Sequence, residues 1–260
     1  MVVFFDIDGT IVDNATQIIP DSAVEAIRLL RENGHIPVVN TGRPFGHIDP
    51  RIRQLAFDGW ICACGMEVIL NGTFLHRDYP SEALCGFVID QCKKNRMLIQ
   101  AETADALYYD ADMTYTPGPL QEASRLAKKG IRVMPYQEAA DRSFIKFVTH
   151  ETEESDRAAF LAAVEPFFYP MIHPGTMIEY SKRGNTKAKG MERLLEALHI
   201  PRAETFAIGD SENDLPMFAV AGTTICMGDG MENLKKAADH ITDPVLGDGV
   251  FHALRHFGLI

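Results

Sequence analysis

The sequence predicts an α/β protein in which a doubly wound, mainly parallel sheet is interrupted by an inserted α+β unit. Near both ends of the chain, short continuous apolar runs alternate with stretches of helical periodicity. This alternation is typical of strands buried on both faces of a parallel sheet and joined by helices. In the middle third the strand candidates are shorter and more polar, which favours an antiparallel sheet. We therefore predict a core formed by residues 1–81 and 183–260 and an insertion at residues 82–182.

Length and composition are those of a protein with a large apolar core. The chain has 260 residues, of which 46% are hydrophobic and 23% are charged. This is enough for one large domain or for a domain with an insertion. The formal net charge is -11, and the basic residues occur singly or in pairs. Non-specific binding to nucleic acid needs clustered Lys and Arg, so we exclude nucleic acid as a partner.

Cysteine usage and the N-terminus both favour a cytoplasmic protein. The five cysteines are scattered and form no Cys-x-x-Cys pair, which predicts reduced, buried thiols. The first residues enter an apolar run at once and lack the features of a signal peptide. No apolar run reaches the roughly 18 residues that a membrane span requires. We therefore expect no membrane partner.

The first half of the core is predicted as strand–helix–strand units. Residues 2–5 form a continuous apolar run, which is typical of a buried strand. The segment Ser22-Ala-Val-Glu25 matches a capping box, and Gly34 is a typical residue after a helix C-terminus. Val24, Ile27 and Leu30 follow between them at helical spacing. The other elements expected in this half are a strand at 36–39, a helix at 51–56 and a strand at 60–64 with Cys62 and Cys64 on one face.

The same sequence patterns predict helices and strands in the insertion and in the second half of the core. In the insertion we expect helices at 82–95 and 156–164 and strands at 107–110, 144–149 and 177–180, with the strand at 144–149 half exposed. The pattern of the core returns at Gly184, and residues 187–198 form an amphipathic helix. The apolar side of this helix is expected to carry Met191, Leu194, Leu195 and Leu198. Further strands are expected at 206–208, 223–227 and 240–242.

Polar or small residues follow four of the predicted core strands, at the edge where a parallel sheet binds its ligands. They are Asp6 and Asp8, Thr41 and Arg43, Cys64-Gly65, and Asp210 and Asp214. Carboxylates gathered at one place repel one another unless a cation lies between them. Oxygen ligands favour Mg2+, which proteins bind through few carboxylates together with substrate phosphate and water. A strand cap or a turn would explain either aspartate of the first pair, but not a second acidic strand end about 200 residues later.

Four segments together resemble the motifs of a known family. "DIDGT" at 6–10, "NTGRP" at 40–44, Lys187 and "GDSENDLPMF" at 209–218 occur in the order found in the haloacid dehalogenase-like phosphohydrolase superfamily. The chain is most similar to its Cof-type, capped sugar-phosphatase-like branch. The resemblance implies a Rossmann-like core and an inserted cap domain that governs substrate specificity. One departure is Cys64-Gly65, where this branch often has Asn-Gly.

The resemblance also implies roles for individual residues. Asp6 would be the nucleophile that becomes an aspartyl-phosphate, and Asp8 the general acid and base. Mg2+ would be held by Asp6, Asp210 and the main-chain carbonyl of Asp8, with Asp214 as a further ligand or acting through water. The residues expected to bind substrate or phosphate are Thr41, Gly42, Arg43, Lys187 and Asn213, and Lys187 would also support Asp6. Gly9 and Gly209 would permit close backbone approach, and Ser211 and Glu212 are candidates for support around the metal.

The function predicted on this basis is Mg2+-dependent hydrolysis of small phosphorylated metabolites, such as sugar phosphates. A phosphomutase or phosphotransferase with the same nucleophile is the first alternative, because the sequence does not show which molecule accepts the phosphoryl group. A non-catalytic, metabolite-binding regulator is the second, and the complete set of motif residues argues against it. In the insertion, His173 is a candidate substrate contact, with an ordinary loop position as the alternative. The oligomeric state does not follow from the sequence.

Overall fold

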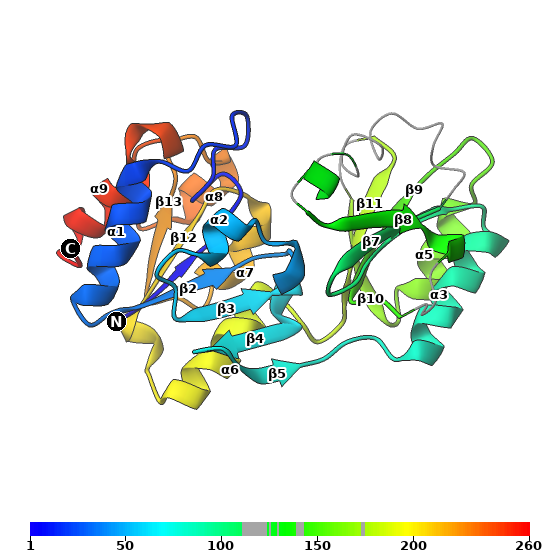
Figure 1. The fold of residues 1–260 in the computed structure, drawn as a ribbon, viewed down its shortest axis with the longest axis horizontal. Coiled ribbons are helices and arrows are strands. Elements are labelled where there is room, and N and C mark those ends of the chain that lie inside the picture. Colours follow the sequence, from blue (N-terminus) through cyan, green and yellow to red (C-terminus); the bar gives the residue numbers. More distant parts are fainter. Residues whose placement is uncertain (111–123, 125, 129, 139–142, 173–174) are drawn as a thin grey trace. The chain divides into compact units, whose positions relative to one another are not determined.

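The structure is a computed structural model that describes residues 1–110, 124, 126–128, 130–138, 143–172 and 175–260 (Figure 1). The chain divides into two compact units. The core unit comprises Met1–Gly42, Arg51–Arg77 and Asn185–Ile260, and the inserted unit comprises Arg43–Pro50 and Asp78–Gly184. Over the described part of the chain, no helix combines the length and the apolar character needed to cross a bilayer.

An eight-stranded sheet forms the centre of the core unit. The strands lie in the order β14 (His240–Ile241), β13 (Thr223–Cys226), β12 (Thr205–Gly209), β1 (Val2–Phe5), β2 (Ile36–Asn40), β3 (Gly59–Cys62), β4 (Glu67–Leu70) and β5 (Thr73–Arg77). Neighbouring strands from β14 to β3 are parallel, and β4 and β5 extend the sheet in antiparallel fashion. The parallel strands therefore end at one edge, where ligands of such sheets bind.

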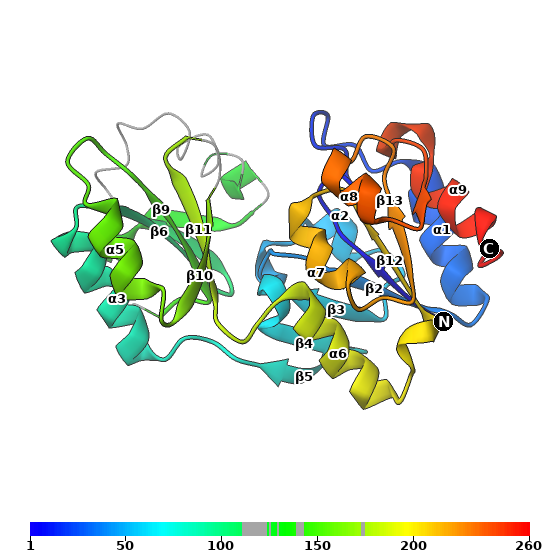
Figure 2. The ribbon, with the colours of Figure 1, turned by 180° about the vertical axis from the view of Figure 1, so that it is seen from behind.

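Helices cover both faces of this sheet (Figures 1 and 2). On one face lie α6 (Lys187–Leu198), α7 (Leu215–Phe218) and α8 (Glu232–Ala237), whose apolar side chains pack against Phe4 and Ala207 of the central strands. On the other face α1 (Asp21–Glu32) and α9 (Gly249–His256) lie side by side. The short α2 (Pro50–Arg53) precedes β3. Alternate residues of β1 point to opposite faces, and all of them are buried, which confirms the α/β fold class.

Helix α1 differs from its prediction at its N-terminus. It begins at Asp21 after Pro20, and no side chain caps it, so the predicted capping box is wrong. The Oγ of Ser22 instead donates to Asp248, and Glu25 accepts hydrogen bonds from Arg28. Ile27 and Leu30 are buried as predicted, whereas Val24 is exposed. Gly34 follows the helix with φ +81°, as expected of the residue that ends it.

The predicted strand at 60–64 is shorter than expected. β3 ends at Cys62, and residues 63–65 form a tight turn in which Ala63, Cys64 and Gly65 all have positive φ. Cys62 and Cys64 therefore do not share one face of a strand, and that prediction is wrong. All five cysteines are free thiols, and all except the half-buried Cys64 are buried as predicted.

A second sheet organises the inserted unit. Its strands lie in the order β10 (Phe168–Ile172), β11 (Met177–Lys182), β9 (Lys146–His150), β6 (Leu98–Glu102), β7 (Ala106–Tyr109) and β8 (Arg132–Pro135). The strand pairs are antiparallel except β7 with β8. The helices α3 (Glu82–Lys94) and α5 (Arg157–Val164), both close to their predicted bounds, pack on one face. The rings of Phe147 and Tyr180 stack at 4.5 Å within this apolar cluster.

Strand β9 is buried along its whole length, so the prediction of a half-exposed strand is wrong. It lies between β6 and β11, and its alternate residues reach both faces of the sheet. On the face opposite α3 and α5, the ammonium of Lys146 pairs with Glu179 of β11. A charged residue fits this buried position because it has a partner.

Candidate active site

The strand ends of the core unit bring the predicted carboxylates together. Asp6 follows β1, and its main-chain N–H donates to Ile208 O of the neighbouring β12 at 3.0 Å. Asp210 follows β12, so parallel pairing places both residues at the same edge of the sheet. Asp214 ends the short 3-10 turn Glu212–Asp214 and is completely buried. Its Oδ2 accepts hydrogen bonds from the main-chain N–H groups of Asp210 and Ser211 at 3.0 and 3.1 Å.

Two glycines make this close arrangement possible, as the sequence predicted. A Cβ atom on Gly9 would lie 2.3 Å from Oδ2 of Asp210. A Cβ atom on Gly209 would lie 2.4 Å from Oδ2 of Asp214. Gly9 also has φ +78°, a conformation that side chains disfavour. Any larger residue at either position would therefore displace a carboxylate of the cluster.

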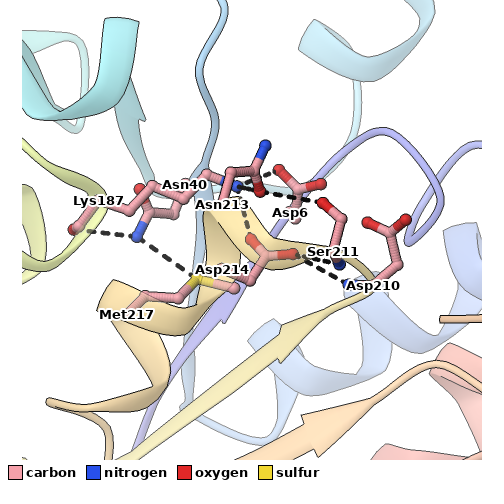
Figure 3. A network of polar contacts seen from close by, with 8 residues as sticks. All are labelled: Asp6, Asn40, Lys187, Asp210, Ser211, Asn213, Asp214 and Met217. Carbon is pink, nitrogen blue, oxygen red and sulfur yellow. Dashed lines mark hydrogen bonds and ion pairs between the residues drawn. The ribbon is translucent and has the colours of Figure 1, made fainter. Parts of the chain in front are cut away.

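Lys187 connects the carboxylates (Figure 3). It opens α6, whose N-terminus is capped by Thr186, and its side chain is buried. The ammonium Nζ donates to Oδ1 of Asp6 and Oδ1 of Asp214, both at 2.6 Å. A third, longer bond of 3.2 Å goes to Oδ1 of Asn213. These acceptors use the three donors of an ammonium group.

The charges of this cluster shift its pKa values strongly. Burial, and to a smaller extent the neighbouring Asp214 and Asp8, raises the pKa of Asp6 to about 7, although Lys187 opposes the shift. Burial and the charges of Asp6 and Asp214 raise the pKa of Asp210 to about 8. Burial alone would lower the pKa of Lys187, but Asp214 and Asp6 more than offset it and raise that pKa. If all three carboxyls were ionised, the cluster would hold more negative charge than one ammonium can neutralise.

The carboxylate oxygens of this cluster could bind a divalent cation. Asp6, Asp210 and Asp214 each offer a carboxylate oxygen, and these oxygens lie within 4.8 Å of one another. Oδ1 of Asp210 is buried and has no hydrogen-bond partner. An unpartnered buried carboxylate oxygen is costly unless it is protonated or meets a cation. Oxygen-only ligands of this kind suit Mg2+.

The other residues predicted for the site lie as follows. Asp8 is partly buried in the turn after β1. Thr41 is buried directly after β2, and its main-chain N–H donates to Ile61 O of β3 at 2.8 Å. Gly42 is the last residue of that core segment, whereas Arg43 belongs to Arg43–Pro50 of the inserted unit. Of the proposed supports, Ser211 contacts Asp214 and Asn213, whereas Glu212 accepts from Asn233. His173 lies outside the described residues.

The sequence did not indicate how α6 is held against the strand ends. Gly190 lies against β3 so closely that a Cβ atom there would come within 2.2 Å of Ile61 Cγ2. Arg193 donates to Gly65 O at 2.9 Å and to Asn185 Oδ1 at 2.8 Å. These contacts fix the helix whose first residue is Lys187. The glycine inside the predicted helix was a signal that could have been used. Glycine lowers the stability of a helix, so its presence there indicates close packing against another element.

Comparisons with known proteins agree with this arrangement. Residues 3–254 match the haloacid dehalogenase-like hydrolase family. The chain is 27% identical to the Bacillus subtilis protein YkrA, over 99% of this chain and 98% of YkrA. It is 26% identical to 5-amino-6-(5-phospho-D-ribitylamino)uracil phosphatase YitU of Bacillus subtilis, over 97% of this chain and 95% of YitU.

Among solved structures, the fold is similar to that of the sugar phosphatase BT4131, of subclass IIB of this superfamily. The TM-score is 0.80 at 26% sequence identity, and the match covers 100% of this chain and 99% of BT4131. The family match spans nearly the whole chain, and YkrA and YitU match it over 98% and 95% of their own length. The chain therefore belongs to the haloacid dehalogenase-like hydrolases, in their Cof-type branch, and is a phosphatase of that family.

Proposed function

We propose that the protein is a Mg2+-dependent phosphatase that hydrolyses small phosphorylated metabolites, such as sugar phosphates, through a phosphorylated Asp6. The observation that carries this proposal is the cluster of Asp6, Asp210 and Asp214, in which the buried Lys187 pairs with Asp6 and Asp214. One ammonium and one divalent cation would together balance three carboxylates. A cluster with this charge, at the ligand-binding edge of a parallel sheet, suits a phosphate ester.

Asp6 and Asp8 would divide the chemistry between them. In the first step a carboxylate oxygen of Asp6 attacks phosphorus, and the bond between phosphorus and the leaving oxygen breaks. Asp8 gives its proton to that leaving oxygen. In the second step Asp8 takes a proton from water, which attacks phosphorus and releases phosphate and the free Asp6 carboxylate. The charge of Asp8 is among the causes that raise the pKa of Asp6, which supports their proximity.

The metal would be held by Asp6, the main-chain carbonyl of Asp8, Asp210 and Asp214. When bound, Mg2+ would neutralise carboxylates and phosphoryl oxygens, so that Asp6 is ionised near neutral pH despite its raised pKa. The unpartnered Oδ1 of Asp210 supports this assignment.

Lys187, Asn213, Thr41, Gly42 and Arg43 would bind the phosphoryl group. The three donors of Lys187 are occupied in the structure. To bind a phosphoryl oxygen, the ammonium must therefore exchange one of these bonds. The bond to Asn213 is the longest and goes to a neutral acceptor, so it is the one that exchanges at least cost.

We further propose that residues 1–81 and 183–260 form the catalytic domain and that residues 82–182 form a cap that selects the leaving group. The motif residues would contact only the phosphoryl group and the metal, so they cannot distinguish one phosphate ester from another. YitU and BT4131, equally similar to this chain, are named for different substrates, so similarity does not select one. The free thiols support a cytoplasmic location.

The test is release of phosphate from a panel of phosphorylated sugars, nucleotides and cofactors with Mg2+. We expect activity that a chelator abolishes and added Mg2+ restores, and that Asp6→Asn lacks. After rapid quenching, phosphate should be found on Asp6 alone. Undiminished turnover in excess chelator would refute the metal assignment, and phosphate on another residue would refute the nucleophile. Transfer to a sugar hydroxyl instead of water would favour the phosphomutase alternative.

A further inference from the structure

Asn40 contacts Lys187 at the start of α6 and Met217 of α7, the helix that follows Asp214 (Figure 3). It is the last residue of β2 and is fully buried. Its Nδ2 donates to the main-chain oxygen of Lys187 at 3.2 Å and lies 3.6 Å from Sδ of Met217. Lys187 begins α6, and Met217 lies on α7, directly after the turn that ends in Asp214. One amide therefore joins the start of α6 to the helix behind Asp214.

The amide is not explained by stability. Val38, two residues earlier on β2, packs in the apolar cluster with Met217 and residues of α6, and strand periodicity directs Asn40 to the same face. Oδ1 of Asn40 is buried and has no hydrogen-bond partner. An unpartnered buried acceptor lowers stability, and an apolar side chain of the same shape would remove that cost.

We propose that Asn40 is a positioning residue, which fixes the start of α6 relative to α7 so that the ammonium of Lys187 reaches Asp6 and Asp214 together. Asn40 itself contacts neither the substrate nor the metal in this proposal, which rests on the function proposed above. A hydrogen bond is directional, whereas an apolar side chain would hold the helix start by packing alone. A small displacement there would misplace the ammonium, since Lys187 is the first residue of the helix.

The experiment compares Asn40→Leu with the unchanged protein. We expect kcat for an aryl phosphate to fall about tenfold or more, with KM changed less than about twofold, because a misplaced catalytic group raises the barrier without weakening binding equally. The thermal unfolding midpoint should be retained or raised. The second readout is the rate at which an amine reagent modifies Lys187, measured by mass spectrometry relative to the exposed Lys189 on the same helix. The ratio of the two modification rates should rise at least about threefold, because the ammonium of Lys187 would leave its buried partners more often.

Asn95 provides a matched control. It is also a buried asparagine whose Nδ2 donates to a main-chain oxygen, that of Gln91 at 2.9 Å, but it lies in the inserted unit. Asn95→Leu should lower stability and leave both kcat and the Lys187 modification ratio unchanged. Asn40→Ala is the second variant at the proposed position, because it removes the same donor without adding volume.

An unchanged Lys187 modification ratio in a folded Asn40 variant would overturn the proposal, whatever its kcat. Failure of both Asn40 variants to fold would overturn it too, because stability is expected to be retained. Lys187→Met and the unchanged protein, measured in parallel, distinguish a failure of the role proposed for Asn40 from a failure of the proposed function. If Lys187→Met is inactive while Asn40→Leu has full activity, only the role of Asn40 is wrong. If Lys187→Met is fully active, the role proposed for Lys187 is wrong, and if the unchanged protein hydrolyses no phosphate ester, the proposed function itself is wrong.

Discussion

The ammonium of Lys187 donates a hydrogen bond of 2.6 Å to Oδ1 of Asp6, although the two residues lie 181 positions apart in the sequence. Both side chains are almost completely buried. A buried charge pair of this kind is weak evidence for stability, because the loss of hydration offsets most of the attraction. The chemistry that we propose for Asp6 is a better explanation for this pair than stability is.

Lys187→Met should therefore impair both activity and stability. We expect kcat to fall at least about 100-fold, because a charged group at the phosphoryl site is lost. In chelator the free energy of unfolding should fall by about 3 kcal/mol, because two buried carboxylates lose their partner. The matched control is Lys189→Met on the same helix, whose exposed ammonium pairs with Glu192. It should change stability by less than about 0.5 kcal/mol, and equal effects of the two variants would contradict the assignment.

The raised pKa values of Asp6 and Asp210 predict how metal-free stability depends on pH. A raised carboxyl pKa means that the folded protein binds the proton more tightly than the unfolded chain, whose value is near 3.8. The stabilisation that the protonated Asp6 and Asp210 contribute to the folded state is complete below the unfolded pKa of 3.8. It is lost as the pH rises through the folded pKa values of about 7 and about 8.

The measurement is the thermal unfolding midpoint between about pH 5 and pH 9 with a chelator present. It should fall with rising pH, and less steeply in Asp210→Asn, which cannot ionise there. Added Mg2+ should stabilise the unchanged protein more at the upper end of this range, because its ligands must be deprotonated. Parallel curves for Asp210→Asn and the unchanged protein would show that Asp210 does not titrate as inferred.

Two helical glycines should respond in opposite ways to alanine. At Gly190 the added Cβ would meet Ile61 at 2.2 Å, whereas at Gly86 of α3 it would meet nothing within 4 Å. Gly190→Ala should cost about 1 to 3 kcal/mol of stability through overpacking and lower kcat, because α6 carries Lys187. Gly86→Ala should gain about 0.5 to 1 kcal/mol, because alanine favours the helix. Chemical denaturation measures the stability of both variants, and kinetics with an aryl phosphate measure kcat. A stabilised Gly190→Ala would contradict the close packing of α6.

Substitutions in the proposed cap should redistribute activity among substrates. Ser181 of β11 lies on the face of the sheet opposite α3 and α5, and its buried Oγ has no partner. Ser181→Ala removes this hydroxyl without cost to stability, and Glu179→Gln on the same face removes a charge. We expect both to change kcat/KM for metabolite phosphates more than for a small aryl phosphate. If each variant changed kcat/KM by the same factor for all substrates, the cap would not select the leaving group.

Cys64→Asn belongs in the same substrate panel, because it restores the residue that this branch often has. Cys64 has φ 54° and ψ 41°, a left-handed conformation that asparagine tolerates better than most residues. We expect the variant to be at least as stable as the unchanged protein. Its substrate profile measures whether the residue after β3 influences the leaving group.

Some of the fold was within reach of the sequence but was not predicted. The hairpin of β4 and β5 turns at Asn71 and Gly72, both with positive φ. Asn-Gly between two strands is a strong hairpin signal, so this turn could have been identified. The burial of β9 could not, because it depends on strands β6 and β11 from distant parts of the chain, and on the partner that Glu179 provides for Lys146.

By itself, the sequence determined the α/β fold class, the approximate bounds of α3, α5 and α6, and the aspartates at the strand ends, because these depend on local periodicity and on the rule that parallel strands end at one edge. Only the tertiary structure decided that Lys187 lies between Asp6 and Asp214, that Asn40 holds the start of α6, and that Gly190 permits its close packing. Each of these contacts joins residues that lie far apart in the sequence. Local sequence preferences do not determine how close such residues come in the folded chain. Packing of whole elements sets those distances, and packing is a property of the folded chain.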